Sequence, residues 1–378
     1  MKWNKLVKSL VVTPLAAFFL WGCGSSGGNG TLSVGLTDAS TDQYQAVYVT
    51  VKAVEVHMSG DAEDSWETVG TPNKTYDLLQ LVNGVRETLG IADLKAGHYT
   101  QMRLILGDTP EGSINILSLA HPFANYVIDL DGNAHELKVP SGMQTGIKIV
   151  HGFDINENST TELVLDFNAG ASVVIAGNSG KYLLKPTIKV LDTRKASIIS
   201  GEVTQSPDDS GLAGTTVSAQ IFDGAAADAK DRVTVQAATI SDDDGRFSLF
   251  LSPGTYNLVF YKQGFQAFVT KITVAAGETA TQDAALGTAA TGTLSGTTSF
   301  SGGDPDAFIT LSFRQDQTIE GNAEQIEITS LNVANGGSYS ATLPEGAVTI
   351  VGSSFGQETD TEISAVIAGS NTTMDMSL

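Results

Sequence analysis

The stretch DDDGRFSLFLSPGTYNL, residues 242–258, carries the clearest signal of fold in this chain. It contains two dipeptides that favour tight turns, Asp244-Gly245 and Pro253-Gly254. Between and after these turns, apolar residues alternate with polar ones, which is the period of a strand with one buried face. The inward positions are Phe247, Leu249, Leu251, Tyr256 and Leu258. The stretch therefore predicts two strands that meet at a sharp corner and share an inward face.

The same residues resemble the carboxypeptidase regulatory-like, or transthyretin-like, domain. That family has an Asp-Gly turn followed by an inward aromatic residue, then a Leu-x-Pro-Gly-x-Tyr corner, then a Gly-aromatic pair. The pair is Gly264-Phe265 in this chain. The resemblance covers about residues 197–286, and it implies a β-sandwich of the carbohydrate-binding-like kind.

Residues 292–378 repeat this pattern 92 residues further on, without a gap. Leu343-Pro344-Glu345-Gly346 falls on residues 251–254, and Tyr339 falls on Phe247. Val348 stands in place of the corner tyrosine, so the copy is degenerate. A match of both turns and inward positions predicts a second sandwich of the same type, with residues 287–291 as the linker.

Residues 31–192 form another β-rich region. Ala46–Met58 alternates with Val47 and Val51 on one face, but the apolar phase slips by one residue at Lys52-Ala53, which predicts a bulge. Residues 76–88 have helical spacing interrupted by Asn-Gly, which predicts a short helix or turn. Further runs predict strands at 31–36, 98–106, 126–130, 136–139, 146–153, 163–167 and 182–191.

Several blocks of this region resemble successive blocks of domain of unknown function 4382. They occur in order at residues 34–40, 46–57, 94–106, 141–153 and 180–190. The resemblance implies an exported β-rich domain and brings no established activity or catalytic residue. Together, the three regions predict an all-β protein with three β-sandwich-like domains in tandem: 31–192, 197–286 and 292–378.

The N-terminus has the composition of a targeting leader. Lys2, Lys5 and Lys8 precede an apolar run at residues 10–21 that is too short to span a bilayer. Gly22 and then Cys23, the only cysteine, follow this run. The residues Leu-Trp-Gly-Cys resemble the lipobox of a bacterial lipoprotein. The resemblance implies a signal peptide at residues 1–22 and palmitate-type acylation of the cysteine; an ordinary secretory signal is the alternative.

The residues after the leader predict that the protein lies in the cell envelope. Residues 23–30 are rich in Gly and Ser and predict a lipidated, flexible tether. Gly24 follows Cys23 where many inner-membrane lipoproteins have Asp, so we expect the outer membrane, on either face. The acylated cysteine makes the lipid bilayer the first predicted partner.

Charge and composition exclude one class of partner. The chain of 378 residues carries a net charge of −21, which becomes −24 without the three leader lysines. Such a surface repels nucleic acid. The hydrophobic content of 41% is enough for packed cores. Because the single cysteine is predicted to be acylated, stability must come from those cores rather than from disulfides.

Residues capable of metal chemistry are present without the usual spacing. Five histidines lie in the first region, and none of their pairs has HxH or HExxH spacing; we expect solvated side chains, with His57 on a half-exposed face. Asp242 and Asp244 offer oxygen ligands for calcium, but the EF-hand glutamate is missing, so a hairpin turn is favoured. These two aspartates remain weak metal candidates, and we predict no cofactor.

Function is predicted at the level of class. There is no GxSxG elbow, no Walker A loop and no cysteine free to act as a nucleophile, which favours a non-enzymatic protein. The leading hypothesis is an envelope lipoprotein with a binding or structural role, whose partner is a glycan or a surface protein. Trp66, Tyr44 and Tyr48 are the candidate ligand-binding aromatics, with core packing as the alternative for Tyr48.

Two other hypotheses stay open. Residues 31–192 could form a metal-dependent or hydrolytic enzyme whose other domains are spacers. The chain could also be a subunit of a surface complex that binds partners through sheet edges.

Overall fold

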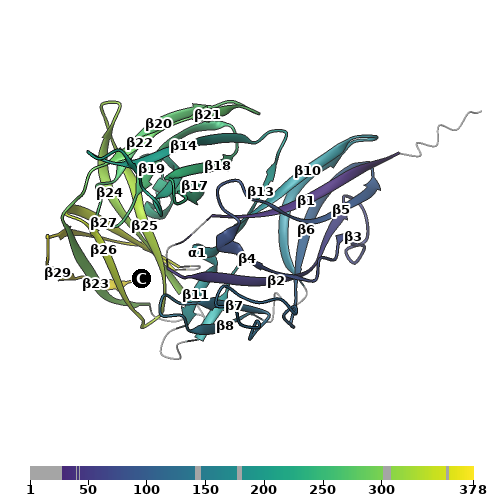
Figure 1. Ribbon diagram of the computed structural model, residues 1–378, viewed down its shortest axis with the longest axis horizontal. Coiled ribbons are helices and arrows are strands. Elements are labelled where there is room, and N and C mark those ends of the chain that lie inside the picture. Colours follow the sequence, from purple (N-terminus) through teal and green to yellow (C-terminus); the bar gives the residue numbers. More distant parts are fainter. Residues whose placement is uncertain are drawn as a thin grey trace, which may run out of the picture.

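The structure, a computed structural model, describes residues 28–39, 41, 43–140, 146–176, 181–300, 308–354 and 357–378. In these ranges the chain is built of strands, with one four-residue α-helix and short 3-10 turns (Figure 1). The predicted all-β arrangement of sandwiches is confirmed. In the same ranges, no helix is long and apolar enough to cross a membrane. The predicted leader, Cys23 and most of the tether lie outside the described residues.

The second sandwich shows the predicted corner. Its strands form two sheets: β14 (Ser197–Gln205), β15 (Ser210–Gly211), β18 (Arg246–Leu251), β21 (Thr279–Thr281) and β22 (Ala284–Leu286) in one, and β17 (Val233–Ile240), β16 (Thr216–Phe222), β19 (Gly254–Tyr261) and β20 (Phe268–Val274) in the other. The corner joins β18 to β19 and so carries the chain from one sheet to the other. All five predicted inward side chains, from Phe247 to Leu258, are at most 5% exposed.

The third sandwich has the same pairing. In its first sheet β23 (Thr291–Ser299) pairs antiparallel with β26 (Ser338–Pro344) and parallel with β29 (Asn371–Thr373) and β30 (Met376–Ser377). Its second sheet contains β25 (Asn322–Ala334), β24 (Phe308–Ile319), β27 (Gly346–Ser353) and β28 (Asp360–Val366). β19 and β27 begin at Gly254 and Gly346, 92 residues apart, so the sequence repeat is also a structural repeat.

The first sandwich repeats this topology as well, which the sequence did not predict. In one sheet β1 (Asn29–Ala39) pairs antiparallel with β5 (Glu87–Lys95) and parallel with β10 (Thr160–Asn168), which pairs with β13 (Ile188–Asp192). In the other, β2 (Ala46–Met58) pairs with β3 (Glu67–Gly70), β4 (Lys74–Asp77) and β6 (Gly97–Leu106), and β6 pairs with β9 (Ile147–Ile155). β1, β2, β5, β6 and β9 therefore correspond to β14, β16, β18, β19 and β20.

A shared tyrosine contact supports this correspondence. The corner from β5 to β6 reads Leu-Lys-Ala-Gly-His-Tyr and the corner from β18 to β19 reads Leu-Ser-Pro-Gly-Thr-Tyr. The hydroxyl of Tyr99 donates to the carbonyl of Lys95 at 3.0 Å, and that of Tyr256 donates to the carbonyl of Ser252 at 2.7 Å. Both rings are buried. The buried tyrosine thus fixes the same corner in both sandwiches.

The first sandwich differs from the others by two additions. The strands β7 (Asn125–Ile128) and β8 (Ala134–Lys138) are inserted between β6 and β9. After α1 (Ala169–Ser172), the strands β11 (Val173–Ala176) and β12 (Lys181–Leu184) join β8 to the third sandwich, because Ile175 pairs with Val333. The two sandwiches therefore share one sheet of 13 strands.

Two local predictions have clear outcomes. The predicted strand at 182–191 is wrong as a single strand, because it is divided into β12 and β13 around Pro186, which has no N–H to donate. The short helix or turn predicted within 76–88 is confirmed as a 3-10 turn at Leu78–Gln80, which the carboxylate of Asp77 caps.

The corner contact gives a testable expectation. Tyr256→Phe removes the hydroxyl that ties the buried ring to the Ser252 carbonyl, so the free energy of unfolding should fall by about 1 kcal/mol. Thr255→Val is the matched control, because the Thr255–Thr273 hydroxyl contact is exposed to water. Urea denaturation measures both. An equal loss in the two variants would contradict the role of the tyrosine.

Candidate functional site

The outer sheet faces of the second and third sandwiches are used to hold them together. Gln220, which is 2% exposed, donates its amide N–H to the carbonyl of Glu327 and accepts from the Glu327 N–H, both at 2.8 Å. Arg314, also 2% exposed, donates to the carbonyls of Ala229 and Lys230 across the same seam. These contacts cover part of both faces, and a second cavity of about 490 Å³, lined by Ser218, Gln220 and Glu327 among others, lies beside them.

The corresponding face of the first sandwich is covered by its own insertion instead. The buried outward residues of β2 here are Tyr48 and Thr50. Tyr48 stacks on Tyr126 of the inserted β7 with 4.7 Å between ring centroids. The hydroxyl of Thr50 donates to the carbonyl of Ala124. The extra elements thus rebuild this face, and they leave a hollow beside β2.

The hollow exists because β2 changes partner along one edge. Residues 46–49 of β2 pair with β7, while residues 51–58 pair with β6. The register shifts between Val51 and Ala53, which confirms the predicted bulge and leaves Lys52 without a ladder partner in β6. The two neighbouring strands separate at this point. A cavity of about 770 Å³ lies in the fork, within the usual size range of small-molecule sites.

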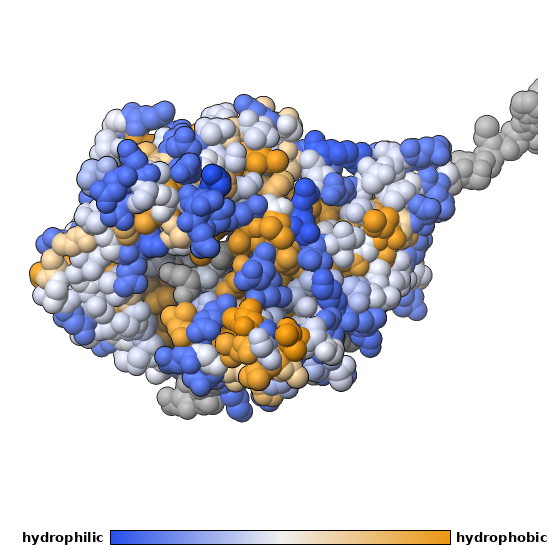
Figure 2. Space-filling model, viewed as in Figure 1, coloured by the Kyte–Doolittle hydropathy of each residue, from blue (hydrophilic) through white to orange (hydrophobic). Residues whose placement is uncertain are grey.

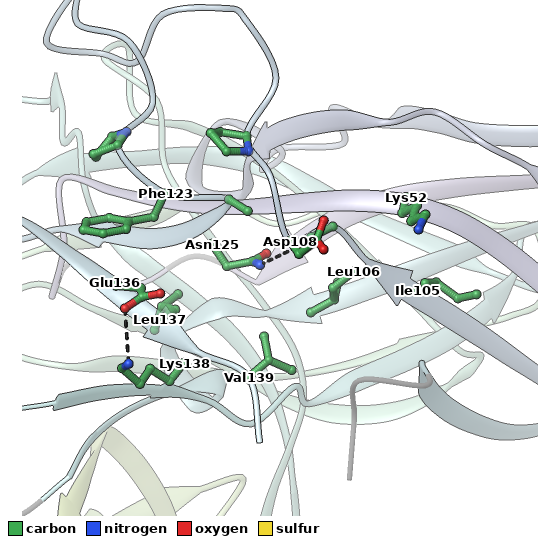
Figure 3. A pocket seen from close by; sticks show the side chains of 14 residues that line it. Lys52, Ile105, Leu106, Asp108, Phe123, Asn125, Glu136, Leu137, Lys138 and Val139 are labelled. Carbon is green, nitrogen blue, oxygen red and sulfur yellow. Dashed lines mark hydrogen bonds and ion pairs between the residues drawn. The ribbon is translucent and has the colours of Figure 1, made fainter. Parts of the chain in front are cut away.

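Hydrogen bonds hold the fork open at a fixed width. The side chain of Asn125 accepts from the N–H of Thr50 at 3.1 Å and donates to the carbonyl of Gly107 at 2.9 Å. The N–H of Gly107 donates to the carbonyl of Thr50 at 2.8 Å. A side chain at Gly107 would meet Thr50 at 2.6 Å, so glycine is required for this close approach. Asn125 thus takes the place of a continuous ladder (Figure 3).

The lining of the fork cavity combines aliphatic and charged side chains. Aliphatic side chains of β6 and β8 form its floor, and charged side chains stand at its rim (Figure 3). The floor residues are Ile105, Leu106, Leu137 and Val139, and the charged residues are Lys52, Asp108, Glu136 and Lys138. Glu136 and Lys138 form an exposed ion pair at 3.4 Å. Among the described lining residues there is no His, Ser, Thr or Cys.

The predicted ligand-binding aromatics do not come together. Tyr44 is 9% exposed and packs edge-on against Tyr182, and Tyr48 is 4% exposed. Buried rings of this kind offer no open face to a sugar. Trp66 is half-buried, and the guanidinium of Arg103 lies 4.3 Å from its ring centroid. Trp66 stays a predicted contact, separate from the fork cavity.

The acidic turn has a structural role. The carboxylate of Asp242 accepts from the N–H groups of Asp244 and Arg246, and Asp244 pairs with the Arg246 guanidinium at 2.8 Å. Gly245 has φ of +82°, which favours glycine. These contacts account for both aspartates as turn residues, the reading that the sequence favoured.

Two of the five histidines are less exposed than predicted. His57 is 8% exposed, because the ring of Trp66 lies over it at 5.4 Å and its Nε2 lies 2.9 Å from the Ala62 carbonyl. The expectation of a solvated, half-exposed side chain is therefore wrong for this residue. His121 is also buried and bridges Ser113 and Tyr126. In the ranges that the structure describes, no group of three or more His, Cys, Asp or Glu could hold a metal ion.

These features define a chain of β-sandwiches whose first member is elaborated around a cavity. Comparison with known families agrees with that division. Residues 29–186 match the Domain of unknown function (DUF4382), and residues 198–287 match the Carboxypeptidase regulatory-like domain. Both resemblances predicted from the sequence motifs are confirmed, in the predicted order.

Solved structures give only distant likenesses. The Bacillus anthracis TIE protein is 11% identical over 93% of this chain and 51% of its own, with a TM-score of 0.20. The 3-chlorocatechol 1,2-dioxygenase from Rhodococcus opacus 1CP is 14% identical over 25% of this chain and 59% of its own, with a TM-score of 0.19. A streptococcal ancillary pilin is 8% identical over 91% and 98%, with a TM-score of 0.20.

This chain spans between 51% and 59% of the first three structures that it matches. At TM-scores this low, the likeness carries no conclusion about what the chain does. No curated protein matches it.

The seam between the first and second sandwiches contains a titratable pair. Lys189 of β13 donates to the carbonyls of Val235 and Gln236 in β17. Burial raises the pKa of the nearby Asp166 carboxyl to about 6, although the Lys189 ammonium opposes this. The folded state therefore holds the Asp166 proton more tightly than the unfolded chain, whose aspartates titrate near about 4. The associated stability is present below about pH 4 and is lost as the pH rises through about 6.

Asp166→Asn should remove this dependence. The free energy of unfolding of the variant minus that of the natural chain should be larger at pH 7.5 than at pH 4.5, by on the order of 2 kcal/mol. Because burial lowers the pKa values of His121 and His151, which act in the opposite direction, the difference between variant and natural chain is the quantity to measure. Chemical denaturation at the two pH values gives it. A pH-independent difference would contradict the assignment.

Proposed function

We propose that this protein is a non-enzymatic, lipid-anchored envelope protein that binds a ligand in the fork cavity of its first sandwich. The observation that carries the proposal is the placement of the cavity. Three sandwiches share one topology, and the cavity is built from an insertion that belongs to the first. The other two present their corresponding faces to each other. The second and third sandwiches then serve as a rigid support.

The lining favours an amphipathic ligand of the size of a short glycan. Aliphatic side chains at the floor suit the apolar face of a sugar ring, and the lysines and carboxylates at the rim suit polar or charged substituents. A carbohydrate or cell-wall fragment is therefore the first ligand class to test. The carbohydrate-binding-like fold of the second sandwich supports the same class by analogy only.

Ligand binding can be tested with the chain from residue 24 to residue 378. A glycan array should identify a ligand, and calorimetry should then give its affinity. Lys52→Glu reverses a rim charge at the bulge and should weaken binding by about tenfold or more. Lys181→Glu makes the same change at an exposed residue of β12 that does not line the cavity, and it should leave binding unchanged. Equal affinities for the two variants, or stoichiometric zinc or iron in the purified chain, would contradict the proposal.

Lipid anchoring is tested separately on the full chain. Expressed in a bacterium that processes lipoproteins, the protein should incorporate labelled palmitate and partition into detergent, since each buried CH₂ contributes about 0.8 kcal/mol. Cys23→Ser should abolish both. Label that persists in the variant, or a natural chain that stays unlabelled in the cytosol, would refute acylation at this cysteine.

A further inference from the structure

The insertion carries an apolar loop at its tip, formed by residues 113–121. Four of its side chains are exposed although they are aliphatic: Ile114 by 66%, Ile116 by 45%, Leu117 by 39% and Leu119 by 60%. Figure 2 shows a hydrophobic patch where Figure 1 places the loops beside β7 and β8. Exposed apolar groups gathered in one place mark an interaction surface.

The loop is held rigid from beneath by buried polar groups. Asn115, 7% exposed, accepts from the N–H groups of Leu117 and Leu119 at 2.9 and 3.1 Å. The N–H of Ile116 donates to the hydroxyl of Tyr48 at 2.9 Å. His121 connects the base of the loop to Ser113 and Tyr126. The exposed side chains are therefore displayed by a fixed backbone rather than by a flexible segment.

The backbone N–H groups of the loop tip are also satisfied internally. The N–H of Asn115 donates to the carbonyl of Leu119, and the N–H of Ser118 donates to the carbonyl of Asn115, both within 2.9 Å. With the three bonds above, every backbone N–H from Asn115 to Leu119 has a partner. A segment that enters hydrocarbon must satisfy these groups without water. A segment that adds to a partner's sheet would instead need them free.

Charge separates the loop from the rest of the protein. The net charge of the chain is −21, yet residues 112–128 contain no Asp, Glu, Lys or Arg. The loop can thus approach an uncharged surface without bringing a charge out of water. The area also argues against self-association, because four aliphatic side chains bury on the order of 300 Å², whereas a stable protein interface needs about 800 Å² on each partner.

We propose that residues 113–121 dock this protein on a phospholipid bilayer, with Ile114 and Leu119 entering the acyl region of neutral lipid. The docking extends the proposed lipid anchoring. Cys23 lies six residues before Asn29, which pairs with Lys95 at the β5–β6 corner, whereas the loop follows β6 at the opposite end of the first sandwich. An acylated chain and the loop therefore contact the same bilayer when the first sandwich lies along the membrane. A short-reaching apolar contact then acts as a second, reversible attachment, and peripheral anchoring is stable when two such signals combine.

The test uses the chain from residue 24 to residue 378, which lacks Cys23 and contains no other cysteine. Leu119→Cys then provides one labelling site for an environment-sensitive fluorophore. Phosphatidylcholine–phosphatidylethanolamine vesicles should shift its emission to the blue, and the shift should persist between about 0.05 and 0.5 M salt. Ile363→Cys is the control label, since Ile363 is 72% exposed on the third sandwich; its emission should not move.

Substitution gives an independent measure. Ile114→Ser with Leu119→Ser should lower the vesicle partition coefficient by about tenfold or more. Ile363→Ser with Ile367→Ser removes a similarly exposed pair, 72% and 56%, and should leave partition unchanged. An unmoved Leu119 label, equal partition of the two double variants, or a Leu119 label buried by dimerisation without vesicles would overturn the proposal. Acylation is measured on the full chain and cavity binding is measured with a soluble glycan and no vesicles, so the failure of either is distinguishable from this one.

Discussion

Side chains alternate across a β-strand, so one extra residue in β2 shifts which side chains face the core. The bulge at Lys52 lies just after the point where β2 changes partner, because residues 46–49 pair with the inserted β7 and Val51 already pairs with β6. The apolar phase shifts from Val51 to Val54, so both halves keep one face in the same core. The fork therefore opens without loss of core packing. The cavity and the Asn125 bridge lie at this place, where the change of partner at Thr50 meets the bulge at Lys52.

Polar seams decide which face of the molecule stays open. Glu327, half-buried near Arg314 and Ser312, has a pKa raised by burial. The backbone N–H and the backbone carbonyl of Glu327 both bond to the side chain of Gln220. Arg314 donates to the carbonyl of Ala229 in the second sandwich. Val259 and Tyr261 of the second sandwich belong to the core cluster of the third. A seam with satisfied polar groups and shared apolar packing fixes the two sandwiches as a unit. The first sandwich is the one whose outer face is built differently.

The sequence predicts those features that depend on neighbouring residues. The corner at 253–254, the inward positions after it, the 92-residue repeat and the bulge at Lys52 all follow from turn chemistry and alternation. The common topology of the first sandwich escapes prediction, because only the Leu-x-x-Gly-x-Tyr corner survives in its sequence and an insertion separates β6 from β9. Tyr48 is an aromatic residue of the kind that contacts ligands, but the loop that buries it lies about 70 residues further along the chain. The fork cavity combines residues from β2, β6, β7, β8 and the loops between them, and no binding motif in the sequence marks these residues as a site.

The fork cavity and the apolar loop belong to one segment, so their mechanics are linked. The chain leaves the cavity at Gly107 and Asp108, forms the loop, and returns through Phe123 to Asn125. Both ends are fixed on β2, through Gly107 and Asn125 on Thr50. A bilayer that takes up the loop tip therefore presses on a segment whose ends cannot move without breaking buried hydrogen bonds, each of which costs about 1 to 3 kcal/mol to leave unmade. Docking then orients the open cavity relative to the membrane while its shape stays the same, which is what a binding protein displayed at a surface requires.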